Sequence, residues 1–235
     1  MVSVVLFSGG YDSTAALLAA LSQHGRRAVL ALTVDYGQRH RQELIASERI
    51  ATALGVTRIT ADARSFGSLA GGALVNRSGP EADMPLGAVA AVVPGRNLML
   101  LSLALACCES NGGTEVWIGC NADDSAAFPD CRNAFLRAAE DCGRLALGHR
   151  IRVVTPWLSV AKRNIPETLI TSYPGARDQA DLLAGSWSCY GGGDQPCGVC
   201  HACVVRGTVP AIESIRIGDT DRLLRKAESE RKAER

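Results

Sequence analysis

A pair of glycines between an apolar run and a helix-forming run, within residues 7–14 (FSGGYDST), limits the possible folds more than any other stretch. Residues 2–6 (VSVVL) are apolar and β-branched, which predicts a buried strand. Residues 15–21 are rich in Ala and Leu and predict a helix that ends at Gly25. Glycines at such a turn let the main chain approach a ligand, and the first helical N–H groups lack partners within the helix. The turn is therefore expected to bind an anion such as phosphate.

The plainer interpretation of this turn is a tight connection in which Asp12 or Ser13 caps the helix. The full string Ser-Gly-Gly-x-Asp-Ser-Thr, however, resembles the signature of the PP-loop ATP pyrophosphatases, which split ATP into AMP and pyrophosphate. A Walker loop is excluded, because the chain has no G-x-x-x-x-G-K-[ST] string. The resemblance implies that a set of residues at and near this turn binds ATP. They are Phe7, Ser8, Gly9, Gly10, Tyr11, Asp12, Ser13, Thr14, Ala15, Ala16, Leu17 and Asp35.

Length and composition restrict the class of protein. With 235 residues, of which 47% are apolar, the chain can form one large domain with a sizeable core. A net charge of +1 gives no reason to expect nucleic acid or a membrane surface as a partner. We recognise no transmembrane run and no signal peptide, and therefore expect a cytoplasmic protein. In a reducing cytosol the nine cysteines should be thiols or metal ligands.

Apolar runs and helical patterns alternate along most of the chain. Strands are expected at residues 2–6, 28–35, 56–60, 114–120 and 152–155, and helices at 39–54, 98–110, 131–147 and from about 159 past 170. This alternation predicts an α/β fold with a five-stranded parallel sheet, Rossmann-like and similar to the adenine nucleotide alpha hydrolases. Residues 65–94 break the pattern and are expected to be an irregular surface excursion, either a mobile lid or a tolerated loop.

Changes in composition divide the chain into three parts. Residues 1–175 are expected to form the PP-loop ATP pyrophosphatase domain, and residues 176–210 a metal-binding helical appendage. Residues 211–235 are a charged tail, expected to form a solvated helix over most of its length.

Four cysteines of the appendage have the spacing C-x7-C-x2-C-x2-C, at Cys189, Cys197, Cys200 and Cys203. Glycines between them supply tight turns that let four thiolates converge on a closed, structural zinc site. An iron–sulfur cluster is the alternative metal centre, but the ferredoxin pattern requires a different last spacing followed by proline. Four buried or idle thiols would be the plainer alternative. His201 lies inside the motif and is expected to face solvent rather than replace a thiolate.

Polar residues follow the second, fourth and fifth predicted strands, at residues 35–40 (DYGQRH), 121–132 and 155–162. The carboxyl ends of parallel strands meet at one edge of a sheet, which is where such sheets bind ligands. Each stretch alone would be explained by helix capping. Together, above a phosphate-binding turn, they predict a pocket.

Charged residues at this edge suit a phosphate ester and a second polar ligand. Lys162, Arg96 or Arg132 could neutralise charge on phosphate oxygens. Asp12 is placed to hold Mg²⁺ against them. Asp130 and Arg132 suit a polar heterocycle or a carboxylate, and the plainer interpretation of these two is a helix cap and a surface ion pair.

Taken together, the motifs resemble one PP-loop family closely, the 7-cyano-7-deazaguanine synthases of queuosine precursor biosynthesis. The matching strings extend from the first strand to Arg206 and are FSGGYDST, VDYGQRH, VPGRN, FPDCR, TPW…K and WSCYGGG…PCGVCHACVVR. Many ATP pyrophosphatases share the glycine loop. The cysteine motif in combination with DYGQRH and PDCR makes the resemblance specific.

The resemblance implies a homodimer that binds zinc through the four cysteines and uses MgATP to activate the carboxylate of 7-carboxy-7-deazaguanine. Ammonia would displace AMP to give an amide, and a second activation would give the nitrile. Asp12, Ser13 and Lys162 are the predicted catalytic residues, and no protein nucleophile is required. The predicted substrate-binding residues are Arg96, Asn97, Asp124, Asp130 and Arg132.

Two stretches depart from the family pattern. Residues 123–128 read DDSAAF where the family has two tyrosines and a serine, and Ala90-Ala91 stand where the family has Asn-Thr. Losing hydroxyl groups there weakens discrimination for a polar substrate. The alternative function is therefore a related deazapurine-pathway or anti-phage enzyme that stops at the amide or transfers the activated acid to a protein amine. The remaining alternatives are a tRNA-thiolating enzyme and a nucleotide-binding module with a structural zinc site.

Overall fold

The structure is a computed structural model that describes residues 2–72, 74–75 and 92–211. The predicted terminal helix, most of the predicted excursion and the Ala90-Ala91 departure lie outside these residues. Along the described stretches, no helix has both the length and the apolar composition needed to cross a bilayer.

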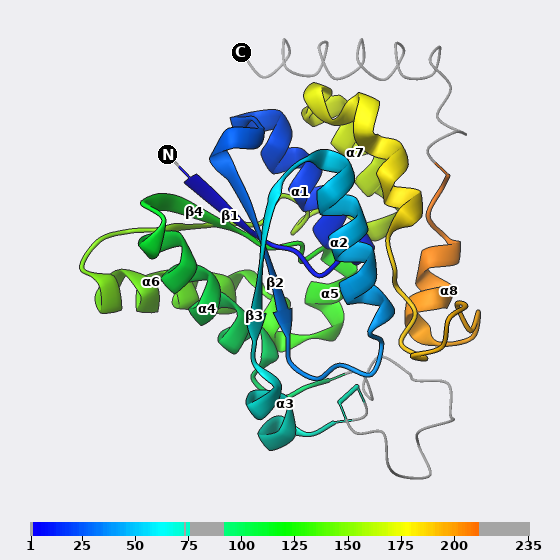
Figure 1. Ribbon diagram of the computed structural model, residues 1–235, viewed down its shortest axis with the longest axis horizontal. Coiled ribbons are helices and arrows are strands. Elements are labelled where there is room, and N and C mark those ends of the chain that lie inside the picture. The colour runs from blue at the N-terminus through cyan, green and yellow to red at the C-terminus, as the bar shows by residue number, and fades with distance from the viewer. Residues whose placement is uncertain (1, 73, 76–91, 212–235) are drawn as a thin grey trace.

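A five-stranded parallel sheet in the order β3-β2-β1-β4-β5 forms the centre of the fold (Figure 1). The strands are β1 (Val2–Leu6), β2 (Val29–Asp35), β3 (Thr57–Asp62), β4 (Gly113–Trp117) and β5 (Arg152–Val154). The prediction of a five-stranded parallel α/β sheet is therefore confirmed. The central position of β1 places the turn that follows it in the middle of the sheet's carboxyl edge.

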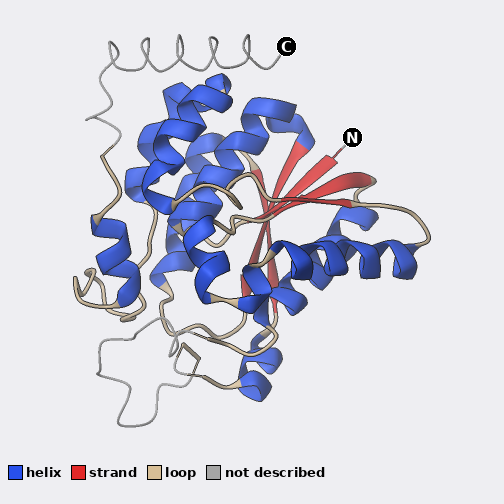
Figure 2. Cartoon of the chain, turned by 180° about the vertical axis from the view of Figure 1, so that it is seen from behind, coloured by secondary structure: helices blue, strands red, loops and turns tan. Residues whose placement is uncertain are grey.

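Helices cover both faces of the sheet (Figure 2). They are α1 (Tyr11–His24), α2 (Gln42–Leu54), α3 (Arg64–Ala70), α4 (Arg96–Ser110), α5 (Ala122–Ala127), α6 (Asn133–Leu147), α7 (Ile165–Ser172) and α8 (His201–Gly207). Side chains alternate along a strand, so Val4 and Leu6 pack in one core with α4 and α6 while Val5 packs in the other with α1, α2 and α7. Residues 174–185, a 3₁₀ segment, join the second core. The division at residue 175 stays a prediction.

Three local predictions of secondary structure were wrong. Residues 64–70, in the expected irregular excursion, form α3. Residues 122–127, expected as loop, form α5, because Asn121 Oδ1 accepts hydrogen bonds from the backbone N–H groups of Asp123 (2.9 Å) and Asp124 (3.0 Å). The helix expected from about residue 159 begins only at Ile165, where Pro166 is tolerated because it lies in the first turn.

Candidate active site

The glycine turn joins β1 to α1, and its geometry requires glycine. Gly9 has a φ of +91°, and a Cβ built there would lie 2.3 Å from the carbonyl oxygen of Glu43. Hydroxyl groups hold the turn: the Ser13 hydroxyl donates to the carbonyl of Gly10 at 3.0 Å, and the Thr14 hydroxyl donates to the same carbonyl at 2.8 Å. Hydrogen bonds within the chain thus fix the shape of the turn.

The amino terminus of α1 has Gly10 as its N-cap residue, without a side-chain capping bond. The plainer interpretation, in which Asp12 or Ser13 caps this helix, is therefore wrong. The first N–H groups of α1 therefore have no capping side chain, as at any helix start that is left open to a ligand. An anion placed there would interact favourably with them and with the helix dipole.

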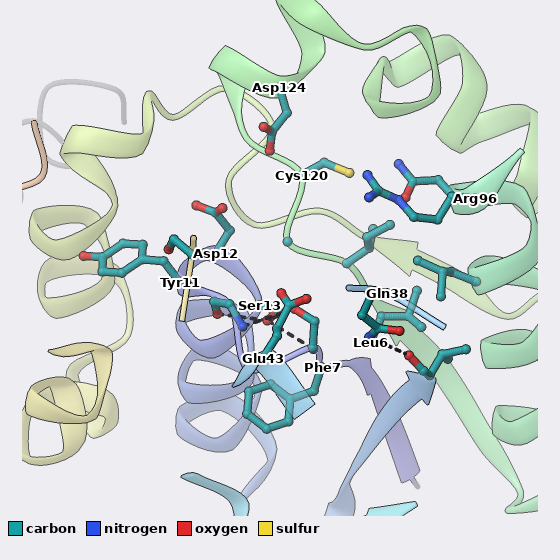
Figure 3. Close-up of a pocket in the computed structure, with 18 of the residues that line it drawn as sticks. Leu6, Phe7, Tyr11, Asp12, Ser13, Gln38, Glu43, Arg96, Cys120 and Asp124 are labelled. Atoms are coloured by element: carbon teal, nitrogen blue, oxygen red, sulfur yellow. Dashed lines mark hydrogen bonds between the residues drawn. The ribbon is translucent and has the colours of Figure 1, made fainter. Parts of the chain in front are cut away.

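A cavity of about 240 Å³ opens beside this turn (Figure 3). It brings together side chains from the turn, from the ends of β2 and β4 and from the start of α4. The predicted site residues that line it are Phe7, Ser8, Gly10, Tyr11, Asp12, Ser13, Arg96, Asn97, Asp124 and Lys162.

The other predicted ATP-binding residues lie outside the lining of this cavity. Thr14–Leu17 are completely buried in α1 and pack towards the core. Gly9 supports the turn through its backbone. The Asp35 carboxylate accepts a hydrogen bond from the backbone N–H of Gly37 at 2.9 Å and pairs with Arg41 at 3.7 Å. These contacts assign Asp35 to shaping the loop after β2.

Two predicted substrate-binding residues also lie outside the cavity. Asp130 contributes its backbone carbonyl, which accepts a hydrogen bond from Asn97 Nδ2 at 3.1 Å. Arg132 donates from Nε to the carbonyl of Ser125 at 3.2 Å and lines a separate surface depression. Both residues therefore support the wall formed by residues 121–132 rather than the cavity's interior.

Asp12 and Lys162 form an ion pair in the cavity, with Lys162 Nζ 2.7 Å from Asp12 Oδ2. Burial alone would lower the pKa of Lys162, but the Asp12 carboxylate raises it above the ordinary value, so the ammonium group stays charged. Burial, and then the charge of Asp12, raise the pKa of Asp124 to about 6. The two carboxylates point towards one another in Figure 3. Asp12 Oδ1 is buried and has no protein partner among the described residues.

A second cation, Arg96, lies across the cavity from Asp12 (Figure 3). Burial opposes its charge, yet the pKa of Arg96 lies above its ordinary value because Tyr36, Tyr190 and Glu43 favour the charged form. Burial raises the pKa values of both phenols, so they remain neutral. A guanidinium flanked by phenol groups suits a planar polar ligand or a carboxylate.

Several lining residues were not predicted as site residues. His40 and Glu43 form a pair with Nε2 and Oε2 3.1 Å apart. The DYGQRH string marks this edge in the sequence, and Glu43 lies three residues beyond it on the first turn of α2. Trp187, Ser188 and Tyr190 come from the cysteine segment. No local pattern connects that segment to a turn nearly the whole chain away.

The four cysteines converge as predicted: one ligand atom from each lies within 4.8 Å of all the others. Cys197 Sγ and Cys203 Sγ are 4.0 Å apart, close to the edge of about 3.8 Å in a tetrahedron with 2.3 Å zinc–sulfur bonds. The backbone N–H groups of Cys200 and Val199 lower the pKa of Cys197 to about 6, which favours a thiolate. The cluster fits a four-coordinate metal, and His201, on the exposed surface, is not part of it.

A parallel α/β sheet with an SGGxDST turn at the end of its central strand is the PP-loop fold expected from the sequence. The chain belongs to the family described as queuosine biosynthesis protein QueC, which matches residues 2–210. The predicted family resemblance is therefore confirmed.

Curated relatives agree with this family membership. A protein from Novosphingobium aromaticivorans is 40% identical over 220 residues, covering 87% of this chain and 88% of the relative. One from Erythrobacter litoralis is 38% identical, with 87% and 85% covered, and one from a Synechococcus species is 35% identical, with 87% and 91% covered. All three are named 7-cyano-7-deazaguanine synthase, which supports an enzymatic role in queuosine biosynthesis.

Proposed function

We propose that this protein converts 7-carboxy-7-deazaguanine to 7-cyano-7-deazaguanine, with ATP as the activating substrate and ammonia as the nitrogen source. One observation carries the proposal. A single cavity contains an uncapped helix amino terminus with the Asp12–Lys162 pair on one side and Arg96 on the other. It thus offers an anion site for a triphosphate beside a cation for an acid. The names of the relatives supply the particular acid and product.

The first step is activation of the acid. A carboxylate is a poor electrophile until one oxygen becomes a leaving group, and bonding that oxygen to the α-phosphorus of ATP releases pyrophosphate. The N–H groups of the turn and Lys162 would stabilise the charge on the departing phosphates. Arg96 would orient the carboxylate towards the α-phosphorus, so that positioning supplies much of the rate. No protein nucleophile is required.

The later steps follow from the oxygen balance. Ammonia adds to the acyl carbon, AMP leaves with the first carboxylate oxygen, and a proton is lost to give the amide. A second ATP then activates the amide oxygen with release of pyrophosphate. Loss of AMP and two protons leaves the nitrile, so that each oxygen of the acid departs on one AMP.

Two metals belong to this proposal. Mg²⁺ would screen the phosphate charges, and the unpartnered Asp12 Oδ1 is a fitting ligand for it. Zinc in the four-cysteine cluster would be structural, because four thiolates leave no open position. The homodimer and the cytoplasmic location expected from the sequence stay predictions.

The test supplies the purified protein with 7-carboxy-7-deazaguanine, an ammonium salt and MgATP, and measures product mass and pyrophosphate. The expected result is the nitrile with two pyrophosphates released per molecule. With heavy oxygen in the carboxylate, both labels should appear in AMP. Accumulation of the amide with one pyrophosphate would overturn the nitrile assignment, and an acyl adduct on an added protein would favour the transferase alternative. Absence of pyrophosphate release would overturn the activation step itself.

A further inference from the structure

The cysteine segment touches the glycine turn at two points. The backbone N–H of Trp187, two residues before the first cysteine, donates to the carbonyl of Gly9 at 2.9 Å. Arg206, one turn beyond Cys203 on α8, places its guanidinium carbon 3.9 Å from the centre of the Tyr11 ring. Tyr11 is the first residue of α1, so both contacts act on the backbone that forms the anion site.

Arg206 makes few other contacts that stabilise its positive charge besides the Tyr11 ring. Its Nη2 donates to the carbonyl of Leu183 at 2.8 Å, whereas its buried Nη1 has no partner among the described residues. Burial lowers the pKa of Arg206, and the nearby Tyr11 and Asp12 oppose that effect. A desolvated cation over an aromatic face contributes enough free energy to change an equilibrium constant for the state that contains the contact by a factor of about 10 to 30.

We propose that Arg206 is a positioning residue through which the metal-bound cluster fixes the nucleotide-binding turn. Cys200 and Cys203 determine where α8 lies, because both belong to the converging set of thiolates. Arg206 extends from that helix and packs over the Tyr11 ring, a contact that we call the clamp. The clamp holds the first turn of α1 in the orientation that presents its N–H groups to phosphate. The inference rests on the proposed function only in requiring that the turn binds ATP.

A matched control exists on α2. Arg49 also donates from Nη2 to a carbonyl of the 174–185 segment, that of Gly185, at 2.5 Å. It differs in being exposed and in making no stack on the glycine turn. Arg49→Met therefore removes an equivalent backbone contact and an equal charge without touching the clamp.

The experiment measures the dissociation constant for MgATP by calorimetry, together with zinc per chain and the melting temperature, in the zinc-loaded full-length protein. Arg206→Met should weaken ATP binding by about 10- to 30-fold, with the zinc content unchanged. Arg206→Lys, which keeps the charge but loses the planar stack, should restore only part of it. Arg49→Met should stay within twofold of the wild type.

Metal removal supplies the second readout. Chelation of zinc should weaken ATP binding in the wild type, and should have little further effect in Arg206→Met, because the clamp is already lost. Equal ATP affinities for Arg206→Met, Arg49→Met and the wild type would overturn the inference. If Arg206→Met fails to fold, Arg206→Lys decides, and an ATP affinity equal to that of the wild type would then overturn the inference. Wild-type protein that binds no ATP would instead overturn the proposed function.

Discussion

The two edges of the sheet differ in how their buried polar groups are paired. At the amino edge, the Glu115 carboxylate accepts hydrogen bonds from Trp117 Nε1 (3.0 Å) and the Ser3 hydroxyl (3.4 Å) and pairs with His24 (2.9 Å) and Arg152. At the carboxyl edge, several buried polar atoms of the described residues lack a hydrogen-bond partner, among them Tyr11 Oη, Asp12 Oδ1, His40 Nδ1, Asn121 Nδ2 and Ser188 Oγ. A saturated buried charge stabilises the fold, whereas unsaturated groups around a cavity are left for a ligand or water to satisfy.

The substitution with the largest expected effect removes the Glu115 carboxylate from the amino edge. Glu115→Ala leaves the buried donors of Trp117 and Ser3 without their acceptor, so we expect a loss of about 2–5 kcal/mol in the free energy of unfolding. Urea denaturation measures this loss, and pyrophosphate release per folded molecule should stay near that of the wild type. Glu115→Gln, which keeps an acceptor, should lose less. A stable Glu115→Ala protein would show that this network contributes little to folding.

Removing Lys162 from the carboxyl edge should affect catalysis instead. Lys162→Ala is expected to lower kcat/KM for ATP-dependent turnover about 10²- to 10³-fold, because it removes a charge that stabilises the phosphates in the transition state. Lys162→Arg should retain part of the activity.

Stability must be separated from this loss of catalysis. A double variant, Asp12→Asn with Lys162→Met, removes both charges and should unfold with a free energy close to that of the wild type while remaining inactive. Wild-type turnover by this double variant would contradict the assignment of the ion pair to catalysis.

The same contrast explains what the sequence could predict. The glycine turn and the cysteine cluster are defined by neighbouring residues and fixed spacing, so their positions could be predicted. The approach of Arg206 and Trp187 to Gly9 and Tyr11 could not, because it depends on how the segment after α7 packs against the sheet.

Two differences between the prediction and the structure have local causes. The Asn-x-x-Asp capping box at Asn121 is a local sequence signal for α5 within a stretch that was expected to be a loop. Thr14–Leu17 are predicted to bind ATP and directly follow the glycine turn in the sequence. In the structure those residues face the core, since α1 packs closely against the sheet.

Asp124 and Glu115 should respond to pH with opposite signs. Burial raises the pKa of Asp124 from 3.8 to about 6, so its charged form destabilises the folded state. This cost is absent below the unfolded-state pKa, grows as the pH rises through the interval up to about 6, and is complete above it. Burial also acts to raise the pKa of Glu115, but Arg152 and Trp117 outweigh it and the net pKa is lowered. The stability from Glu115 is therefore lost as the pH falls.

Asp124→Asn should accordingly raise the free energy of unfolding by about 1–3 kcal/mol at pH 8, with the gain vanishing near pH 4. Asparagine keeps an acceptor for the backbone N–H of Asn121, so the start of α5 is retained. Urea denaturation across this pH range measures the effect. A gain independent of pH would mean that shape rather than charge is responsible. A gain of the expected form would show that the cavity's carboxylates weaken the fold, as expected if this edge is arranged for a ligand rather than for stability.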